Sequence, residues 1–218
     1  MIFVTGFGQM CNNILQFGHL YAWGKERGLP VIALRFCYKY PFFSINRAKH
    51  YNWFTYLFAK YGAKMHLIPQ VSFLSEADVN EANRKKLSGK RFVLVKGWYL
   101  RDYEAFLRHR KELGELFAFQ PSLREKMDRA LPRPAEHTVR LGVHVRRGDY
   151  KRWMDGDFFF SDADFIRIIQ SFLLLFENQP VEILIVSNEK SLSRTLYERS
   201  LPAPVYFPAG NPGEDLYA

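Results

Sequence analysis

The chain has 218 residues, of which 48% are hydrophobic, 24% charged and 17% aromatic. This composition supports a substantial core, in one large domain or two small ones, and excludes a disordered or fibrous protein. The formal charge of +9 predicts attraction to anions; nucleic acid, an anionic membrane and a diphosphate-bearing ligand all fit at this level.

Cysteine content and the N-terminal residues indicate where the protein resides. Cys11 and Cys37 cannot form a disulfide framework and lack the spacing of a metal site, which favours a reducing compartment. The start of the chain shows no secretory signal, and no apolar run reaches the length of a membrane span. We expect a soluble cytoplasmic protein whose basic patches can contact the inner face of a membrane.

From the N-terminus, strands alternate with helices. An apolar strand at 2–5 leads through a glycine-rich turn into a helix at 12–27, whose apolar residues recur at helical spacing. Gly28 and Pro30 end this helix, and a second strand follows. The later elements of this part are expected at 31–34, 64–68 and 91–96 for strands, and at 53–60, 76–87, 102–117 and 121–131 for helices.

Pro132 and Pro134 mark the clearest break in the chain. Strands alternating with helices on both sides of it predict two α/β units with parallel sheets, at 1–134 and 135–218, and a ligand cleft between them. Ser161, with Asp164 three residues later, predicts a helix N-terminus. The elements expected after the break are strands at 139–145 and 181–187 and helices at 161–177 and 191–200.

Polar side chains gather where the strand at 139–145 ends, in the run His144-Val145-Arg146-Arg147-Gly148-Asp149-Tyr150. In open α/β sheets, ligands bind outside the carboxyl ends of the strands. If the extended geometry continues, residues 144, 146 and 148 share one face, and the two arginines point to opposite sides. One guanidinium can then give a diphosphate two parallel charged hydrogen bonds. The other can pair with an acid such as Asp149 or support the loop.

Three stretches resemble the α1,2-fucosyltransferases. The run at 144–150 is similar to their His-x-Arg-Arg-x-Asp signature, and the segment at 97–103 resembles their Gly-Tyr-Trp-Gln segment. The segment at 8–17 resembles their N-terminal Gly-Gly-Leu-Gly-Asn-Gln-Met-Phe-Gln-Tyr. In that last segment, Asn12, Gln16 and Phe17 match the family pattern, and Gln9 and Cys11 depart from it. In the segment at 97–103, Leu100 departs from it.

The resemblance implies a GT-B-like fold whose first unit lies on the acceptor side and whose second unit binds GDP-fucose. Family members continue past the position of Ala218, so the resemblance also implies that the second unit is incomplete. The implied activity is inverting transfer of fucose to a sugar hydroxyl, α1,2 to a terminal galactose of a surface glycan. The implied partners are a nucleotide sugar and a glycan acceptor, with no nucleic acid, no cofactor and no obligatory metal; the oligomeric state stays open.

The predicted site residues fall into a catalytic and a substrate-binding group. The catalytic residues are Arg146, which would offset the charge that builds on the departing diphosphate, and Asp149. Asp149 could hold an arginine, bind the nucleotide or act as the base, and the first of these is favoured. The general base is not identified; Asp155 and Asp157 are candidates, and their Asp-Gly-Asp run follows a polar loop instead of a strand, which argues against a metal site. The expected substrate-binding residues are His144, Arg147, Tyr150, Asn12, Gly8 and Gln16.

Two alternatives remain at this point. The turn at 6–11 approximates the Gly-x-Gly-x-x-Gly fingerprint of dinucleotide-binding proteins, and Arg35 after the second strand would suit the 2′-phosphate of NADP. Cys11 replaces the third glycine, which weakens this reading. The second alternative is a fucosyltransferase-like fold that binds anions or glycans without activity.

Overall fold

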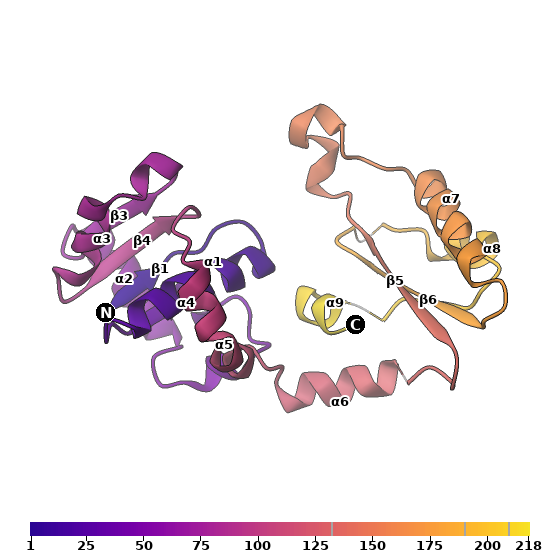
Figure 1. Ribbon diagram of the computed structural model, residues 1–218, viewed down its shortest axis with the longest axis horizontal. Coiled ribbons are helices and arrows are strands. Elements are labelled where there is room, and N and C mark those ends of the chain that lie inside the picture. Colours follow the sequence, from indigo (N-terminus) through magenta and orange to yellow (C-terminus); the bar gives the residue numbers. More distant parts are fainter. Residues whose placement is uncertain (132, 190, 209) are drawn as a thin grey trace. The chain divides into compact units, whose positions relative to one another are not determined.

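The computed structural model describes residues 1–131, 133–189, 191–208 and 210–218, and the side chain of Asp149 lies outside the description (Figure 1). The chain divides into two compact units, Met1–Gln120 and Pro121–Ala218. Each unit contains its own parallel sheet, which confirms the predicted α/β fold with two parallel-sheet units. The division falls after Gln120 and not after residue 134, because the helix that follows Gln120 packs with the last helix of the chain.

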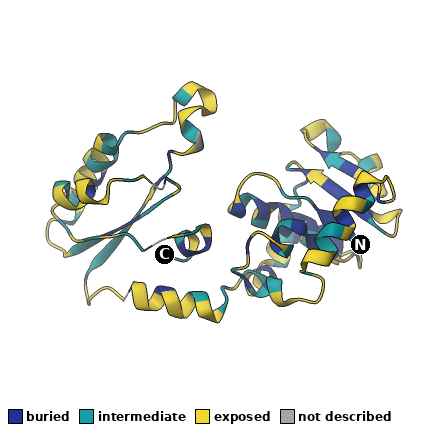
Figure 2. Cartoon of the chain, turned by 180° about the vertical axis from the view of Figure 1, so that it is seen from behind, coloured by how far each residue is buried: buried dark blue, intermediate teal, exposed yellow. Residues whose placement is uncertain are grey.

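The first unit is a four-stranded parallel sheet, in the order β2-β1-β4-β3, with helices on both faces. Successive strand residues point to opposite faces: Val4 and Val95 pack with α1, whereas Phe3 and Leu94 pack with α2. In Figure 2 the central strands of this unit are buried. Its elements are β1 (Ile2–Val4), α1 (Met10–Lys25), β2 (Val31–Ala33), α2 (Trp53–Lys64), β3 (Gln70–Phe73), α3 (Glu81–Ser88), β4 (Val93–Gly97), α4 (Tyr103–Arg108) and α5 (Arg110–Leu116).

The strand predicted at 64–68 is wrong, because α2 continues through Lys64 and then ends in a tight turn. His66 has a left-handed conformation with φ of 59°. The N–H of Leu67 donates to the carbonyl of Gly62 at 2.8 Å, and the N–H of His66 donates to the carbonyl of Ala63 at 3.2 Å. These two bonds form a Schellman motif, which usually has glycine at the left-handed position. The strand follows only after this turn, as β3.

The helix predicted at 102–117 is two helices. His109, with φ of −97° and ψ of 9°, separates α4 from α5. The helix predicted at 76–87 is likewise a 3₁₀ turn, Glu76–Asp78, followed by α3.

The second unit has three parallel strands in the order β5-β6-β7. The two long strands have the predicted bounds, and Ser161 caps α7 as predicted: its Oγ accepts from the N–H of Asp164 at 3.2 Å. The short β7 and α9 are not predicted from the sequence. No helix in the described ranges is both long and apolar enough to cross a bilayer. The elements are α6 (Pro121–Ala130), β5 (Val139–Val145), α7 (Asp162–Leu173), β6 (Val181–Ser187), α8 (Arg194–Ser200), β7 (Val205–Tyr206) and α9 (Pro212–Tyr217).

Candidate functional site

The residues that end β5 alternate between the core and the surface. Val145 and Arg147 are buried, whereas His144 is exposed and Arg146 is partly exposed. The extended geometry therefore continues past the last strand residue, and the two arginines occupy opposite sides of the chain as predicted.

Arg147 is held inside the second unit by two carboxylates. Its Nη1 lies 3.0 Å from Oδ1 of Asp162 at the start of α7, and its Nη2 lies 2.7 Å from Oε2 of Glu189 after β6. The hydroxyl of Tyr197 donates to the same Asp162 oxygen at 2.7 Å. Burial alone would raise the pKa of Glu189, but the hydrogen bond from Lys151 and the charge of Arg147 outweigh it and hold that pKa below its ordinary value.

This network assigns Arg147 a structural role. Its side chain is only 7% exposed, and its two terminal nitrogens face protein acids. The geometry therefore does not support the prediction that Arg147 binds substrate. One of the two arginines was expected to pair with an acid; Arg147 does so, with Asp162 and Glu189.

Arg146 lies against an aromatic cluster on the outer side. Its guanidinium carbon is 4.6 Å from the ring centroid of Tyr150. Tyr150 in turn stacks on Trp153, with centroids 5.3 Å apart and an interplanar angle of 21°, and Trp153 contacts Phe158 at 5.1 Å. The cation therefore has a fixed aromatic support while part of the side chain remains exposed.

His144 precedes Arg146 by two residues on the same side. Desolvation by neighbouring groups, together with the positive charge of Arg146, lowers the pKa of His144 below its ordinary value. The ring is therefore neutral at pH 7, so one of its nitrogens can accept a hydrogen bond or a proton.

The loop after β5 is fixed by residues that follow β6, which the sequence reasoning missed. The side-chain oxygen of Asn188 accepts from the N–H groups of Arg147 and Gly148, at 3.1 and 3.4 Å. A Cβ on Gly148 would stand 2.8 Å from the amide nitrogen of Asn188, so a larger residue would disturb this contact. The signal for Asn188 was its position: it directly follows a parallel strand at the same sheet edge as the motif.

The structure offers little support for the acidic residues that are candidates for catalysis. The backbone of Asp149 begins a 3₁₀ turn, and its side chain lies outside the described structure, so its predicted catalytic role stays a prediction. Asp155 and Asp157 are exposed, and Asp155 has a left-handed φ of 54°. Among the described side chains, no group of three or more His, Cys, Asp and Glu residues is placed to hold a metal ion.

The other predicted residues lie in the first unit, which is described separately from the second. Gly8 has a φ of 61°, and a Cβ there would stand 2.5 Å from the amide nitrogen of Asn12 in the first turn of α1. Gln16 is buried and donates to the carbonyl of Gly97 at the end of β4. Gln16 thus ties α1 to the sheet, and this position does not support its predicted contact with substrate.

Asn13, which the sequence reasoning missed, organises the turn between β1 and α1. Its side-chain oxygen accepts from the N–H of Phe7 at 3.0 Å, and its amide donates to the carbonyls of Gly8 and Gln9. Asn12 does not cap the helix, since α1 begins at Met10 with Gln9 as the N-cap residue. The turn is therefore organised by Asn13, and the predicted contact of Asn12 with substrate stays a prediction.

Comparison with known proteins supports the fold. No family model and no curated protein matches the chain. Among solved structures it is similar to POFUT1, crystallised in complex with GDP-fucose, with a TM-score of 0.50 and 8% sequence identity over 99% of this chain and 86% of that one. At this identity the likeness shows the architecture alone. The chain therefore has a GT-B-like fold, an architecture that it shares with POFUT1.

Proposed function

We propose that the protein is an inverting glycosyltransferase that moves fucose from GDP-fucose to a sugar hydroxyl. The observation that carries the proposal is the division of the arginine pair at the carboxyl end of β5. Arg147 is held inside the unit by Asp162 and Glu189, and Arg146 lies partly exposed at the sheet edge where α/β proteins bind ligands. The likeness to a structure that contains GDP-fucose favours this ligand over other diphosphates.

The chemistry requires a positive group at this edge. The bond between the fucose anomeric carbon and the β-phosphate oxygen breaks, which builds negative charge on the departing GDP and an oxocarbenium-like sugar. The guanidinium of Arg146 offsets the charge on the diphosphate, a role that needs no metal ion. The acceptor hydroxyl attacks the opposite face of the sugar and loses its proton to a base, which inverts the anomeric centre.

The remaining groups on the outer side suit the rest of a nucleotide. The cluster of Tyr150, Trp153 and Phe158 offers flat apolar surface next to the cation, as a guanine base or a sugar ring requires. The neutral ring of His144 can accept a hydrogen bond from a ribose hydroxyl. By the sequence resemblance, the acceptor is a terminal galactose and the new linkage is α1,2; Asp149 is the further catalytic candidate.

Calorimetric titration with GDP tests the donor site. We expect saturable binding that is unchanged by magnesium, is lost in Arg146→Ala, and is weakened but measurable in Arg146→Lys. Arg152→Ala is the matched control, because Arg152 is an exposed cation in the same loop. Equal losses in Arg146→Ala and Arg152→Ala would show that binding depends only on general charge, and would refute the site.

Activity is tested separately with GDP-fucose and a set of galactose-terminated acceptors. We expect Arg146→Ala to lower turnover by at least about a hundredfold, by analogy with the loss of one oxyanion-hole donor. GDP binding without product would favour the inactive binder, and stabilisation by NADPH instead of GDP would favour the dinucleotide-binding alternative.

A further inference from the structure

The first unit contains a long segment of chain without acidic residues. From Arg27 to Ser75 there is no aspartate or glutamate. The same segment carries seven lysines and arginines, at Arg27, Arg35, Lys39, Arg47, Lys49, Lys60 and Lys64. The segment therefore carries a positive charge with no acidic residue of its own to neutralise it, which favours an anionic partner.

Helix α2, in the middle of this segment, is apolar on its outward side. Its inward side packs on the sheet through Ala59 and Ala63, which are buried. On the other side Phe54 is 82% exposed, and Met65, in the turn after the helix, is 67% exposed. The α2 outer face, as we name it, consists of Trp53, Phe54, Phe58, Tyr61, Met65 and Leu67, each at least half exposed. An exposed aromatic patch of this kind marks an interaction surface.

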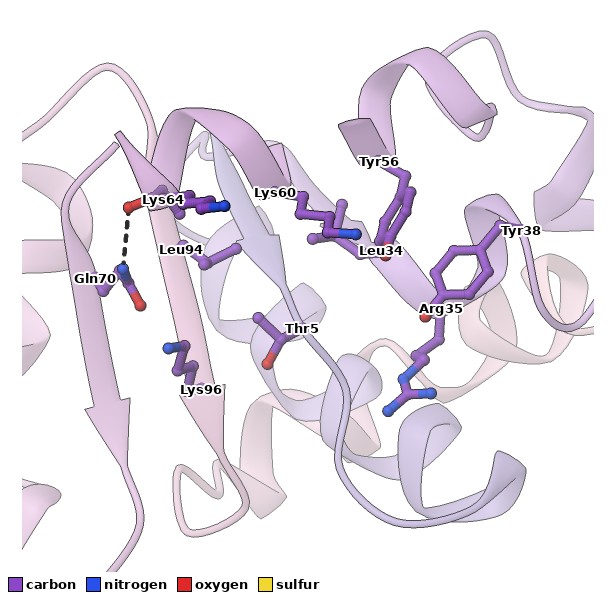
Figure 3. Close-up of a pocket in the computed structure, with 11 residues that line it drawn as sticks. Thr5, Leu34, Arg35, Tyr38, Tyr56, Lys60, Lys64, Gln70, Leu94 and Lys96 are labelled. Carbon is purple, nitrogen blue, oxygen red and sulfur yellow. Dashed lines mark hydrogen bonds between the residues drawn. The ribbon is translucent and has the colours of Figure 1, made fainter. Parts of the chain in front are cut away.

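A basic pocket of about 370 Å³ opens along one flank of α2 (Figure 3). Lys60 and Lys64 enter it from the helix, and Lys96 enters it from the carboxyl end of β4, with Tyr56 beside Lys60. Arg35, which the sequence had linked to a 2′-phosphate, completes the set of cations. No acidic side chain lines the pocket, and within the described structure none of these four cations forms a salt bridge. A phosphate group suits such a pocket.

We propose that the first unit docks on an anionic membrane surface through α2. The α2 outer face enters the boundary between headgroups and acyl chains, and the pocket beside it takes the phosphate of an anionic lipid. Aromatic residues flanked by lysines are the composition of helices that lie in the membrane interface. Lys60 and Lys64 can keep their charges at the level of the headgroups while their stems cover apolar surface.

Charge selects the membrane over a second copy of the chain. A symmetric dimer through α2 would bring the two acid-free segments together, with cations against cations. A bilayer with anionic headgroups is complementary to both parts of the surface, the apolar side chains and the cations.

Vesicle co-sedimentation tests the proposal with the whole chain. We expect binding to vesicles of phosphatidylcholine with phosphatidylglycerol, and little binding to phosphatidylcholine alone. Phe54→Ser should weaken it at least about tenfold, through lost apolar insertion. The double variant Lys60→Gln and Lys64→Gln should weaken it about 30-fold, from about 1 kcal/mol for each cation near the surface. Lys96→Gln changes the pocket but not the helix. It should reduce only the extent to which vesicle binding increases with the phosphatidylglycerol content.

Matched controls lie elsewhere on the surface. Leu175→Ser changes an apolar residue that is 73% exposed in the second unit, and Lys85→Gln with Lys90→Gln removes two exposed lysines on and after α3. Both controls should bind like the wild type, and circular dichroism checks that every variant is folded. Vesicle binding that is absent, or that the controls weaken as much as the α2 variants, would overturn the proposal. So would a concentration-dependent dimer that Phe54→Ser abolishes, because the face would then be covered by a second copy.

Discussion

Replacing Arg147 by methionine should destabilise the second unit far more than the same change at Arg146. Methionine keeps much of the length and apolar volume of the side chain but removes the cation that neutralises Asp162 and Glu189. Removal of one member of a buried ion network costs about 3–5 kcal/mol, because the remaining charges are left uncompensated. The side chains of Asp162 and Glu189 are 25% and 15% exposed, so water compensates part of this loss. We therefore expect about 3 kcal/mol, at the lower end of that range.

Equilibrium unfolding in urea measures the effect, with tryptophan fluorescence as the signal. Trp153 is the one tryptophan of the second unit, since the other three, Trp23, Trp53 and Trp98, lie in the first. The free energy of unfolding comes from the midpoint, provided that the slope with urea is unchanged. Arg146→Met should cost less than about 1 kcal/mol, because the side chain is partly exposed and water compensates for the contacts it loses, the cation–π contact with Tyr150 among them. Equal losses in the two variants, or a loss below about 1 kcal/mol in Arg147→Met, would refute the structural role of Arg147.

Four further substitutions test other contacts. Glu189→Gln should remove a pH-dependent contribution to the free energy of unfolding. Because the folded pKa of Glu189 lies below the ordinary 4.5, this contribution is complete above about pH 4.5 and is lost as the pH falls through the folded value. The unfolding curves of wild type and variant should therefore converge in acid. Gly97→Ala should lower the free energy of unfolding, measured by thermal unfolding, by more than about 1–3 kcal/mol, because φ is 95° and a Cβ would stand 2.1 Å from the carbonyl oxygen of Phe73. Gly114→Ala, at an exposed position inside α5, should raise it by about 1 kcal/mol. The reverse order of stabilities would contradict the backbone geometry. Asn13→Ala should speed amide exchange in the turn before α1, because the N–H of Phe7 loses its acceptor, and unchanged exchange there would exclude this role.

The sequence predicts the second unit's long strands well, because β6 is mostly apolar and the apolar residues of β5 alternate with Arg140, Gly142 and His144. It also predicts the alternation at the end of β5, since the two-residue period of a strand needs no knowledge of neighbours. The partners of Arg147 could not be predicted, because Asp162 and Glu189 are distant in the sequence and meet it only when α7 and β6 are in place. The turn after α2 was missed for a local reason: His66 takes a left-handed conformation without the glycine that usually marks one.

In the first unit, too, the roles of the predicted site residues depend on contacts that the sequence alone does not reveal. Gln16 matches a family position, yet burial decides its role, and burial depends on where the end of β4 lies. Asn12 and Asn13 are adjacent amides that pattern alone cannot tell apart. Only the path of the turn shows that Asn13 points inward and bonds to it.

The neighbouring guanidinium groups at 146 and 147 have a practical consequence for redesign. Because a single peptide bond separates a surface position from an interior one, residue 146 can be varied to change ligand preference while Arg147 keeps its ion pairs inside the second unit. A library that randomises both positions together would lose most of its members to unfolding. One that leaves 147 as arginine and varies 146 and 150 should yield folded proteins in which the proposed binding of GDP can be compared directly.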